Sequence, residues 1–175
     1  MTEVLVEHHW EPPLTDADMD SMIGSTAGCF GMHRVGRNCS LLSADGRELF
    51  CHFTAPDAES VRIALHQACA PRGEVWSGTV HDAPGLTDDG LAQANILVSR
   101  RFDASVAFEE IQALDDVGSS RFLTHRARRM RTYFSTNRRR MVCLYHAPDA
   151  ESVRIALREA RMPVERVWAF RQFRS

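Results

Sequence analysis

The sequence predicts an α+β protein built from two copies of one unit, each with the element order βαββαβ. The strongest observation behind this prediction is a repeat, because Ala55–Leu65 (APDAESVRIAL) recurs letter for letter at Ala147–Leu157, 92 residues later. The same offset relates further positions, such as Val4–Val6 and Ile96–Val98. A period of this length is close to the size of one small domain and far above that of solenoid repeats.

The first part of each copy predicts a strand followed by a helix. Val4–Trp10 is a short apolar stretch typical of a strand. Thr15 precedes acidic residues, which favours a helix N-terminus there, and we expect this helix to end near Gly28. The apolar stripe expected to face the core is Leu14, Met19, Met22 and Ile23 in copy one and Val106, Ile111, Leu114 and Val117 in copy two.

The rest of each copy predicts a hairpin, a second helix and a last strand. The Asp-Gly pair within Ser43–Gly46 is typical of a hairpin turn, and copy two has Asn137-Arg138 there, which loses the glycine but keeps a residue tolerant of positive φ. The other copy-one elements are strands at His33–Leu42, Glu48–Thr54 and Glu74–His81 and a helix that begins at Pro56-Asp57.

This element order is that of the ferredoxin-like unit, in which two helices cover one face of a four-stranded antiparallel sheet. The other face needs a partner, so we expect the two sheets to pack face to face as an α+β barrel, within one chain or by exchange in a dimer. The expected domains are residues 1–84, acidic and rich in His and Cys, and residues 93–175, rich in Arg. Residues 85–92 form the expected linker, since Pro, Gly and acidic residues gather around it.

Composition predicts a soluble, cytoplasmic protein. No apolar run approaches the roughly 20 residues that a membrane-spanning helix needs, and the N-terminus lacks a signal-peptide pattern. The five cysteines are odd in number and have no framework spacing, which fits a reducing compartment.

Charge is divided unequally between the two copies. Residues 1–91 carry 14 acidic residues and 5 arginines, a net charge of −9, whereas residues 92–175 carry 9 and 16, a net charge of +7. Opposite charges favour docking of the halves, within one chain or between two. The alternative is a division of labour, with metal-coordinating groups in copy one and an anion-holding or structural copy two.

Three segments carry a resemblance to a known family. They are the polar cluster Glu7–Trp10, the hairpin Ser43–Gly46, and the strand-to-helix segment Phe50–Glu59 with its counterpart Cys143–Glu151. Each copy resembles the small bacterial nickel-binding, ferredoxin-like domain family, most of whose members have no assigned function. The resemblance implies the fold and nickel as the metal. Members of this family are usually single domains that dimerise, so a tandem arrangement departs from the pattern.

Copy one contains the residue types of a transition-metal site. Strand alternation puts Glu7 and His9 on one face of the first strand and His8 on the other. Imidazole, carboxylate and thiolate groups that converge across adjacent strands would suit a borderline divalent metal. The alternative is a set of isolated polar residues, each satisfied by one hydrogen bond. The candidate ligands are Glu7, His8, His9, His33, Cys51 and His52.

Copy two lacks most of these candidates, because Arg100 and Arg101 stand where copy one has His8 and His9. A divalent cation would be repelled there, so we expect one metal site per chain. His125-Arg126 matches His33-Arg34, and the matched pair could hold the anionic end of a ligand or cap the sheet edge.

The arginine-rich segment Arg126–Arg140 includes Tyr133 and Phe134, a combination that invites comparison with RNA-recognition modules. Met141–His146, however, lacks the basic-Gly-aromatic pattern of those modules. We therefore expect no nucleic-acid partner and interpret the segment as a hairpin arm that docks on an acidic neighbour.

Two functions remain open on sequence grounds. The first is binding of nickel or another divalent metal by copy one. The second is a small-molecule enzyme or ligand-binding barrel of the cyclase, isomerase or monooxygenase kind, with a cavity between the two sheets. The residues expected to line that cavity are His125, Tyr133, Phe134, His33 and His9.

Overall fold

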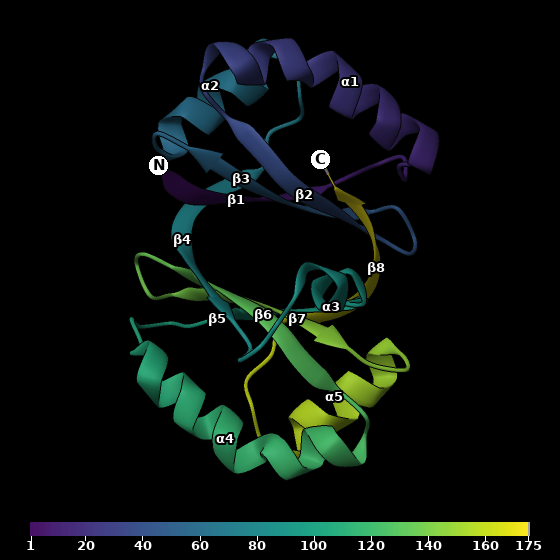
Figure 1. Ribbon diagram of the computed structural model, residues 1–175, viewed down its shortest axis with the longest axis vertical. Helices are drawn as coiled ribbons and strands as arrows, with labels where there is room; N and C mark the ends of the chain where they lie inside the picture. The colour runs from purple at the N-terminus through teal and green to yellow at the C-terminus, as the bar shows by residue number, and fades with distance from the viewer. Residues whose placement is uncertain (175) are drawn as a thin grey trace. The chain divides into compact units, whose positions relative to one another are not determined.

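A computed structural model describes residues 1–174 and divides into two compact units (Figure 1). The first unit comprises residues 1–78 and the segment that begins at Arg171, and the second comprises residues 79–170.

The first unit has the predicted order of elements. They are β1 (Thr2–His9), α1 (Asp16–Met32), β2 (Gly36–Ser43), β3 (Glu48–Ala55), α2 (Ala58–Gln67) and β4 (Glu74–Asp82). Antiparallel pairing gives the strand order β4-β1-β3-β2, with Glu7 opposite both Phe50 and Glu74. The first helix runs past Gly28, whose position is free of close contacts, and ends at Met32.

The second unit repeats this order. Its elements are β5 (Ile96–Arg101), α4 (Phe108–Thr124), β6 (Arg128–Ser135), β7 (Arg140–His146), α5 (Ala150–Glu159) and β8 (Arg166–Arg174), preceded by the short helix α3 (Asp88–Ala92). The strand order is β8-β5-β7-β6, again antiparallel. The predicted α+β class and both ferredoxin-like units are thus confirmed, and part of the expected linker, residues 85–92, forms α3.

Two strands are shared between the units, so that the units differ from the predicted halves. β4 pairs with β1 as far as Gly78, whereas its last residues belong to the second unit, where the amide of Ala83 donates to the carbonyl of Met130 (2.9 Å). Likewise β8 pairs with β5 at its start, and its end lies in the first unit, where Arg37 donates to the carbonyl of Phe173 (2.9 Å).

Each unit buries an apolar core between its two longer helices and one face of its sheet (Figure 1). In the first unit Val4 and Val6 of β1 contribute to this core together with Met19 of α1. In the second unit Ile96 and Val98 of β5 occupy the matching places. Strand alternation then requires the residues between them to face the opposite side of the sheet.

The predicted inward stripe of α4 is wrong in part. Leu114 is 53% exposed and Val117 is 84% exposed. The buried positions on this helix are Ile111, Asp115, Gly118 and Phe122. Gly118 is required by close packing, because a Cβ there would lie 2.8 Å from the Cβ of Ala160, the C-cap of α5. The packing of the two helices therefore decides which stripe faces inward, and it turns an acidic residue towards the core.

The hairpin turns of the two units use different residues in one conformation. Gly46 has φ +74° and Arg138, at the matching position, has φ +58°. In both turns this residue donates its amide to a serine carbonyl three residues earlier, Gly46 to Ser43 (2.9 Å) and Arg138 to Ser135 (2.8 Å). The residue with positive φ is thus Arg138 itself rather than Asn137.

This difference predicts opposite effects on stability. A Cβ at Gly46 would lie 2.3 Å from the carbonyl oxygen of Leu14, so Gly46→Ala should lower the free energy of unfolding by about 1–3 kcal/mol. Arg138→Gly should raise it by up to about 1 kcal/mol, because glycine adopts the left-handed region without steric cost. Chemical denaturation of the two variants measures both effects, and a destabilised Arg138→Gly variant would contradict this account.

Candidate functional site

The structure distributes the predicted metal ligands over both faces of the first sheet. His8 and Cys51 lie on the helix-covered side, where both border a small cavity. Glu7, His9 and His52 lie on the opposite face, as strand alternation requires. The predicted separation of His8 from Glu7 and His9 is therefore confirmed.

Each ligand candidate on the face away from the helices has its own partner. Glu7 accepts a hydrogen bond from Trp76 Nε1 (2.9 Å), His9 Nδ1 lies 3.0 Å from Glu48 Oε1, and His52 pairs with Glu3. Among residues 1–174 no three His, Cys, Asp or Glu side chains are grouped so that they could hold a metal ion. The expected convergence of the candidates into one cluster is thus not found, and the set does not fit a nickel site of three or more protein ligands.

Burial keeps the two candidates on the helix side in their neutral forms, which suits an imidazole ligand but not a cysteine ligand. Burial lowers the pKa of His8 to about 4, so its imidazole is neutral at pH 7, and its Nδ1 is buried without a hydrogen-bond partner. Burial raises the pKa of the Cys51 thiol to about 12, whereas metal ions bind the thiolate. In both units the buried cysteine lies next to a hydroxyl group of the neighbouring strand. Cys51 Sγ is 3.2 Å from Ser40 Oγ, and Cys143 Sγ is 3.5 Å from Thr132 Oγ1.

Each of the matched histidines is the C-cap of the first helix of its unit and lies within hydrogen-bond distance of the second helix. His33 is the C-cap of α1, with Nε2 2.7 Å from Gln67, and His125 is the C-cap of α4, with Nε2 3.0 Å from Glu159. Arg126 follows with φ +55° and donates its amide to the carbonyl of Leu123 (3.1 Å), while Ala127 donates to that of Phe122 (2.8 Å), the two hydrogen bonds of a Schellman motif. These contacts give the repeated His-Arg pair a structural role at the end of each first helix.

The aromatic pair predicted to line one cavity is divided between two faces. Phe134 belongs to the core under the helices, whereas Tyr133, its neighbour on β6, points to the other side of the sheet. None of His125, Arg126, Tyr133 or Phe134 borders the pocket described below.

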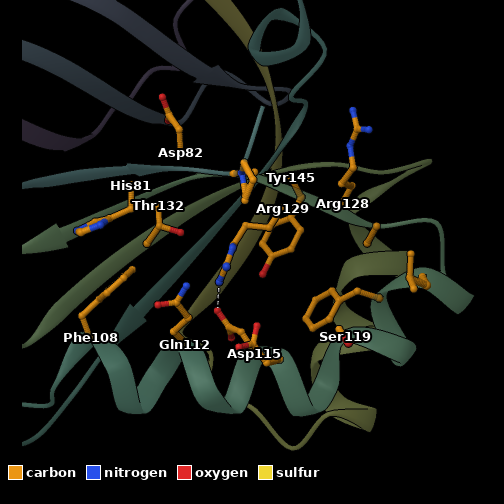
Figure 2. Close-up of a pocket in the computed structure, with 16 residues that line it drawn as sticks. His81, Asp82, Phe108, Gln112, Asp115, Ser119, Arg128, Arg129, Thr132 and Tyr145 are labelled. Atoms are coloured by element: carbon orange, nitrogen blue, oxygen red, sulfur yellow. Dashed lines mark hydrogen bonds and ion pairs between the residues drawn. The ribbon is translucent and has the colours of Figure 1, made fainter. Parts of the chain in front are cut away.

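That pocket lies within the second unit, between α4 and the sheet, and has a volume of about 610 Å³ (Figure 2). α4 contributes Phe108, Gln112, Asp115 and Ser119 to one wall, and β6 with the end of β4 forms the other. The full lining is His81, Asp82, Ala83, Pro84, Phe108, Gln112, Asp115, Asp116, Ser119, Phe122, Leu123, Ala127, Arg128, Arg129, Thr132 and Tyr145.

Three charged side chains are linked at the pocket: Asp115 and Arg129 line it, and the buried Arg100, which is not a lining residue, pairs with Asp115. Asp115 is 8% exposed and accepts a hydrogen bond from Arg100 Nη1 on Oδ1 (3.4 Å). Its Oδ2 accepts one from Arg129 Nη1, the bond drawn in Figure 2. Arg100 is only 1% exposed, and its Nε has no hydrogen-bond partner. Burial alone would lower the pKa of Arg100, but Cys143, Tyr145 and Asp115 nearby raise it above its usual value, so the guanidinium stays charged.

Aromatic rings line the rest of the pocket. At one end His81 stacks on Phe108 with a centroid distance of 4.0 Å, and burial together with Arg129 lowers the pKa of His81. Deeper in, Tyr145 stacks on Phe122 at 5.5 Å. Burial raises the pKa of Tyr145, so its hydroxyl remains a hydrogen-bond donor. The pocket therefore combines an apolar wall with a few fixed donors.

The first unit has a cavity at the matching place, but with different chemistry. His8, Ile23 and Arg37 stand where the second unit has Arg100, Asp115 and Arg129. This cavity has a volume of only about 30 Å³, room for one or two waters. Arg37 donates instead to the backbone carbonyls of Phe173 and Arg174. The large pocket with buried charges thus belongs to the second unit.

Sequence reasoning missed the residues that define this pocket. Arg100 was interpreted only as a residue that excludes metal, and Asp115 fell outside the predicted helix stripe. One available signal was the exchange of Ile23 for Asp115 between otherwise similar helices. An acidic residue at an apolar position of a repeat marks a buried partner of opposite charge.

Comparison with known families concerns the second unit. Residues 97–169 match the family model described as nickel responsive protein SCO4226-like. No curated protein sequence matched the chain.

Comparison with solved structures concerns the fold. A putative chlorite dismutase is 13% identical, with a TM-score of 0.52 over 98% of this chain and 93% of that one. A mutant chlorite dismutase from Candidatus Nitrospira defluvii, in complex with cyanide, is 13% identical, with a TM-score of 0.50 over 97% and 90%. A putative monooxygenase from Lactobacillus acidophilus is 9% identical, with a TM-score of 0.47 over 98% and 94%. At these identities the first two likenesses support the α+β fold alone.

None of the helices in residues 1–174 has the length and apolarity that a membrane crossing requires.

The neutral, buried imidazole of His8 predicts a pH dependence of stability. Between pH 6.5 and about 4 the unfolded chain binds a proton on His8 that the folded chain does not, so stability falls as the pH falls through this window. The full effect is about 3 kcal/mol at most. Chemical denaturation at pH 7 and pH 4.5 should therefore show a smaller loss for His8→Leu than for the unmodified protein. The exposed His66→Leu serves as the control, and equal losses in all three proteins would contradict the prediction.

Proposed function

We propose that the protein binds a small organic molecule in the pocket between α4 and the sheet of the second unit. The observation that carries this proposal is the volume of about 610 Å³ together with the ion pair of Asp115 and Arg129, both of which line the pocket. Ligand pockets in proteins commonly measure 300–1,000 Å³ and combine apolar walls with a few placed polar groups. Binding of this kind is a step that carriers and enzymes share.

This proposal keeps the small-molecule alternative from the sequence but moves its location. The sequence predicted a cavity between two sheets, whereas the pocket that supports the proposal lies inside one unit, beneath a helix. Phe108, Phe122 and Leu123 would contact the apolar body of the ligand. Arg129 and Tyr145 would supply its polar contacts.

A bulky residue at the pocket wall tests the proposal. Ser119 borders the pocket and is exposed on α4, so Ser119→Trp should fill the space without disturbing the core (Figure 2). The neutral probe 2-naphthamide should bind the unmodified protein saturably in an NMR titration, with shifts at pocket residues. Ser119→Trp should weaken this binding at least about tenfold, by steric exclusion.

The repeat offers a matched control for this experiment. Ala27 occupies the same position of α1 in the first unit and is exposed there, so Ala27→Trp should leave binding unchanged. Absence of saturable binding, or equal binding by Ser119→Trp and the unmodified protein, would overturn the proposed function.

The family match supports a second candidate function, binding of nickel. The matched segment, residues 97–169, carries none of the six residues predicted as ligands, so the candidates remain those of the first unit. Of these, His9 is the exposed histidine, with Glu48 3.0 Å away, and we propose this pair as the first protein ligands to test.

Elemental analysis of untagged protein tests the nickel proposal. After loading with Ni²⁺ and dialysis, the chain should retain about one nickel ion, and His9→Ala should retain clearly less because it loses the exposed imidazole. His66→Ala removes an exposed histidine of α2 and should retain as much as the unmodified protein. Nickel content that is negligible in the unmodified protein, or unchanged in His9→Ala, would contradict the proposal.

A further inference from the structure

The pocket of the second unit contains a buried hydroxyl group for which the protein supplies no partner. Tyr145 of β7 is only 2% exposed, yet it borders the pocket. Among residues 1–174 its hydroxyl neither donates nor accepts a hydrogen bond. Figure 2 shows this hydroxyl directed from the sheet towards α4. Its partner is therefore to be sought in a molecule that enters the pocket.

This hydroxyl is suited to donate a hydrogen bond. Burial raises the pKa of Tyr145, so the group stays protonated at pH 7. Arg129 lies directly opposite Tyr145 in the pairing of β6 with β7, so the two side chains lie on one face of the sheet. A guanidinium also donates and cannot accept. This part of the pocket therefore favours a ligand with a hydrogen-bond acceptor.

The charged residues that line the pocket do not require a charge on the ligand. Asp115 pairs with Arg129, and Asp82 is bound by Arg131 (2.5 Å). The other two charged lining residues are exposed and opposite in sign: Asp116 and Arg128. Since an ion would lose its hydration without meeting an unpaired buried charge, a neutral ligand fits this set best.

The rings around the pocket favour a flat apolar body. His81 stacks on Phe108 with 20° between the ring planes, and Tyr145 stacks on Phe122 with 12° between them. All four residues line the pocket. Aromatic ligands gain from offset or edge-on contact with such rings in addition to the burial of apolar surface.

The first unit shows that the fold does not need the hydroxyl. Phe53 occupies the matching position of β3, opposite Arg37, and is 2% exposed like Tyr145. It packs on Phe30, the counterpart of Phe122, with a centroid distance of 5.3 Å. Phenylalanine therefore fills this core position, and the hydroxyl is present only in the unit that has the large pocket.

We propose that the ligand is a neutral carbonyl compound with a flat apolar body, and that the Tyr145 hydroxyl donates a hydrogen bond to its carbonyl oxygen. This inference rests on the proposed function and adds the chemical class of the ligand. A carbonyl group fits because it accepts hydrogen bonds without carrying a charge.

A matched pair of probes isolates the carbonyl oxygen. 2-Acetylnaphthalene and 2-ethylnaphthalene differ only in the C=O or CH₂ group next to the ring, and NMR titration of the full-length protein gives the dissociation constant of each. Tyr145→Phe should weaken binding of the ketone about fivefold, the loss expected for one hydrogen bond. Binding of 2-ethylnaphthalene should be nearly unchanged, because that probe has no acceptor.

Two further variants and a stability measurement complete the test. Tyr133→Phe removes the hydroxyl of the other tyrosine in the chain, which does not border the pocket, and should change neither dissociation constant. Ser119→Trp should weaken both probes by filling the space. Thermal unfolding should show that Tyr145→Phe is no less stable than the unmodified protein, since phenylalanine already fills the matching position of the first unit. Equal effects of Tyr145→Phe on the two probes, or the same selective loss in Tyr133→Phe, would overturn the inference.

The outcomes also separate this inference from the proposed function. If 2-naphthamide binds and Ser119→Trp weakens its binding, but Tyr145→Phe does not discriminate between ketone and hydrocarbon, the pocket function stands and the carbonyl inference is wrong. If none of the three probes binds, both are wrong.

Discussion

In each unit two helices cover a single face of a four-stranded sheet, so every strand must present one apolar side to them. This constraint orders much of the molecule. It puts His8 and Cys51 under the helices and leaves Glu7, His9 and His52 on the opposite face, although all five lie on two neighbouring strands. Residues that are adjacent in sequence are thereby separated by the thickness of the sheet. A metal cluster built from alternate residues of β1 and β3 is therefore restricted to one face at a time.

The same architecture contains different chemistry in its two copies. Under the first helix of the first unit, the neutral His8 and apolar side chains close most of the space, and Arg37 donates to backbone carbonyls. Under the first helix of the second unit, Asp115 holds two arginines and a large pocket lies above them. Burial of Asp115 alone would be costly, and burial of Arg100 alone would cost more, so each residue requires the other. Differences between the two units thus indicate where function lies, whereas their shared residues indicate what the fold needs.

The sequence predicts the fold well because its signals are local. Strand alternation, helix caps and the repeated Ala-Pro-Asp-Ala-Glu segment depend on near neighbours, and Asp57 and Asp149 cap their helices with nearly identical backbone angles. The pocket depends on contacts between residues far apart in the chain. Asp115 faces inward because Gly118 lets α4 approach α5, and Leu114 and Val117 are exposed for the same reason. The apolar periodicity of α4 alone does not reveal which of its faces is buried. The matched His33 and His125 are a repeated feature that the sequence does reveal, but they recur because each caps the end of a helix, not because the two units share a binding site.

Because β4 and β8 each belong partly to both units, the chain cannot be cut between the two sequence repeats without dividing a unit. β4 and β8 each begin in one unit and end in the other, so the first unit is built from residues 1–78 and the segment that begins at Arg171, whereas the second is the continuous segment 79–170. A protease cut at the loop before α3 would leave each fragment without the strand end that completes its own unit. A gene fragment that ends there would have the same defect. Although the sequence repeats, the second unit is contained in residues 79–170, whereas a stretch that contains the first unit must span nearly the whole protein.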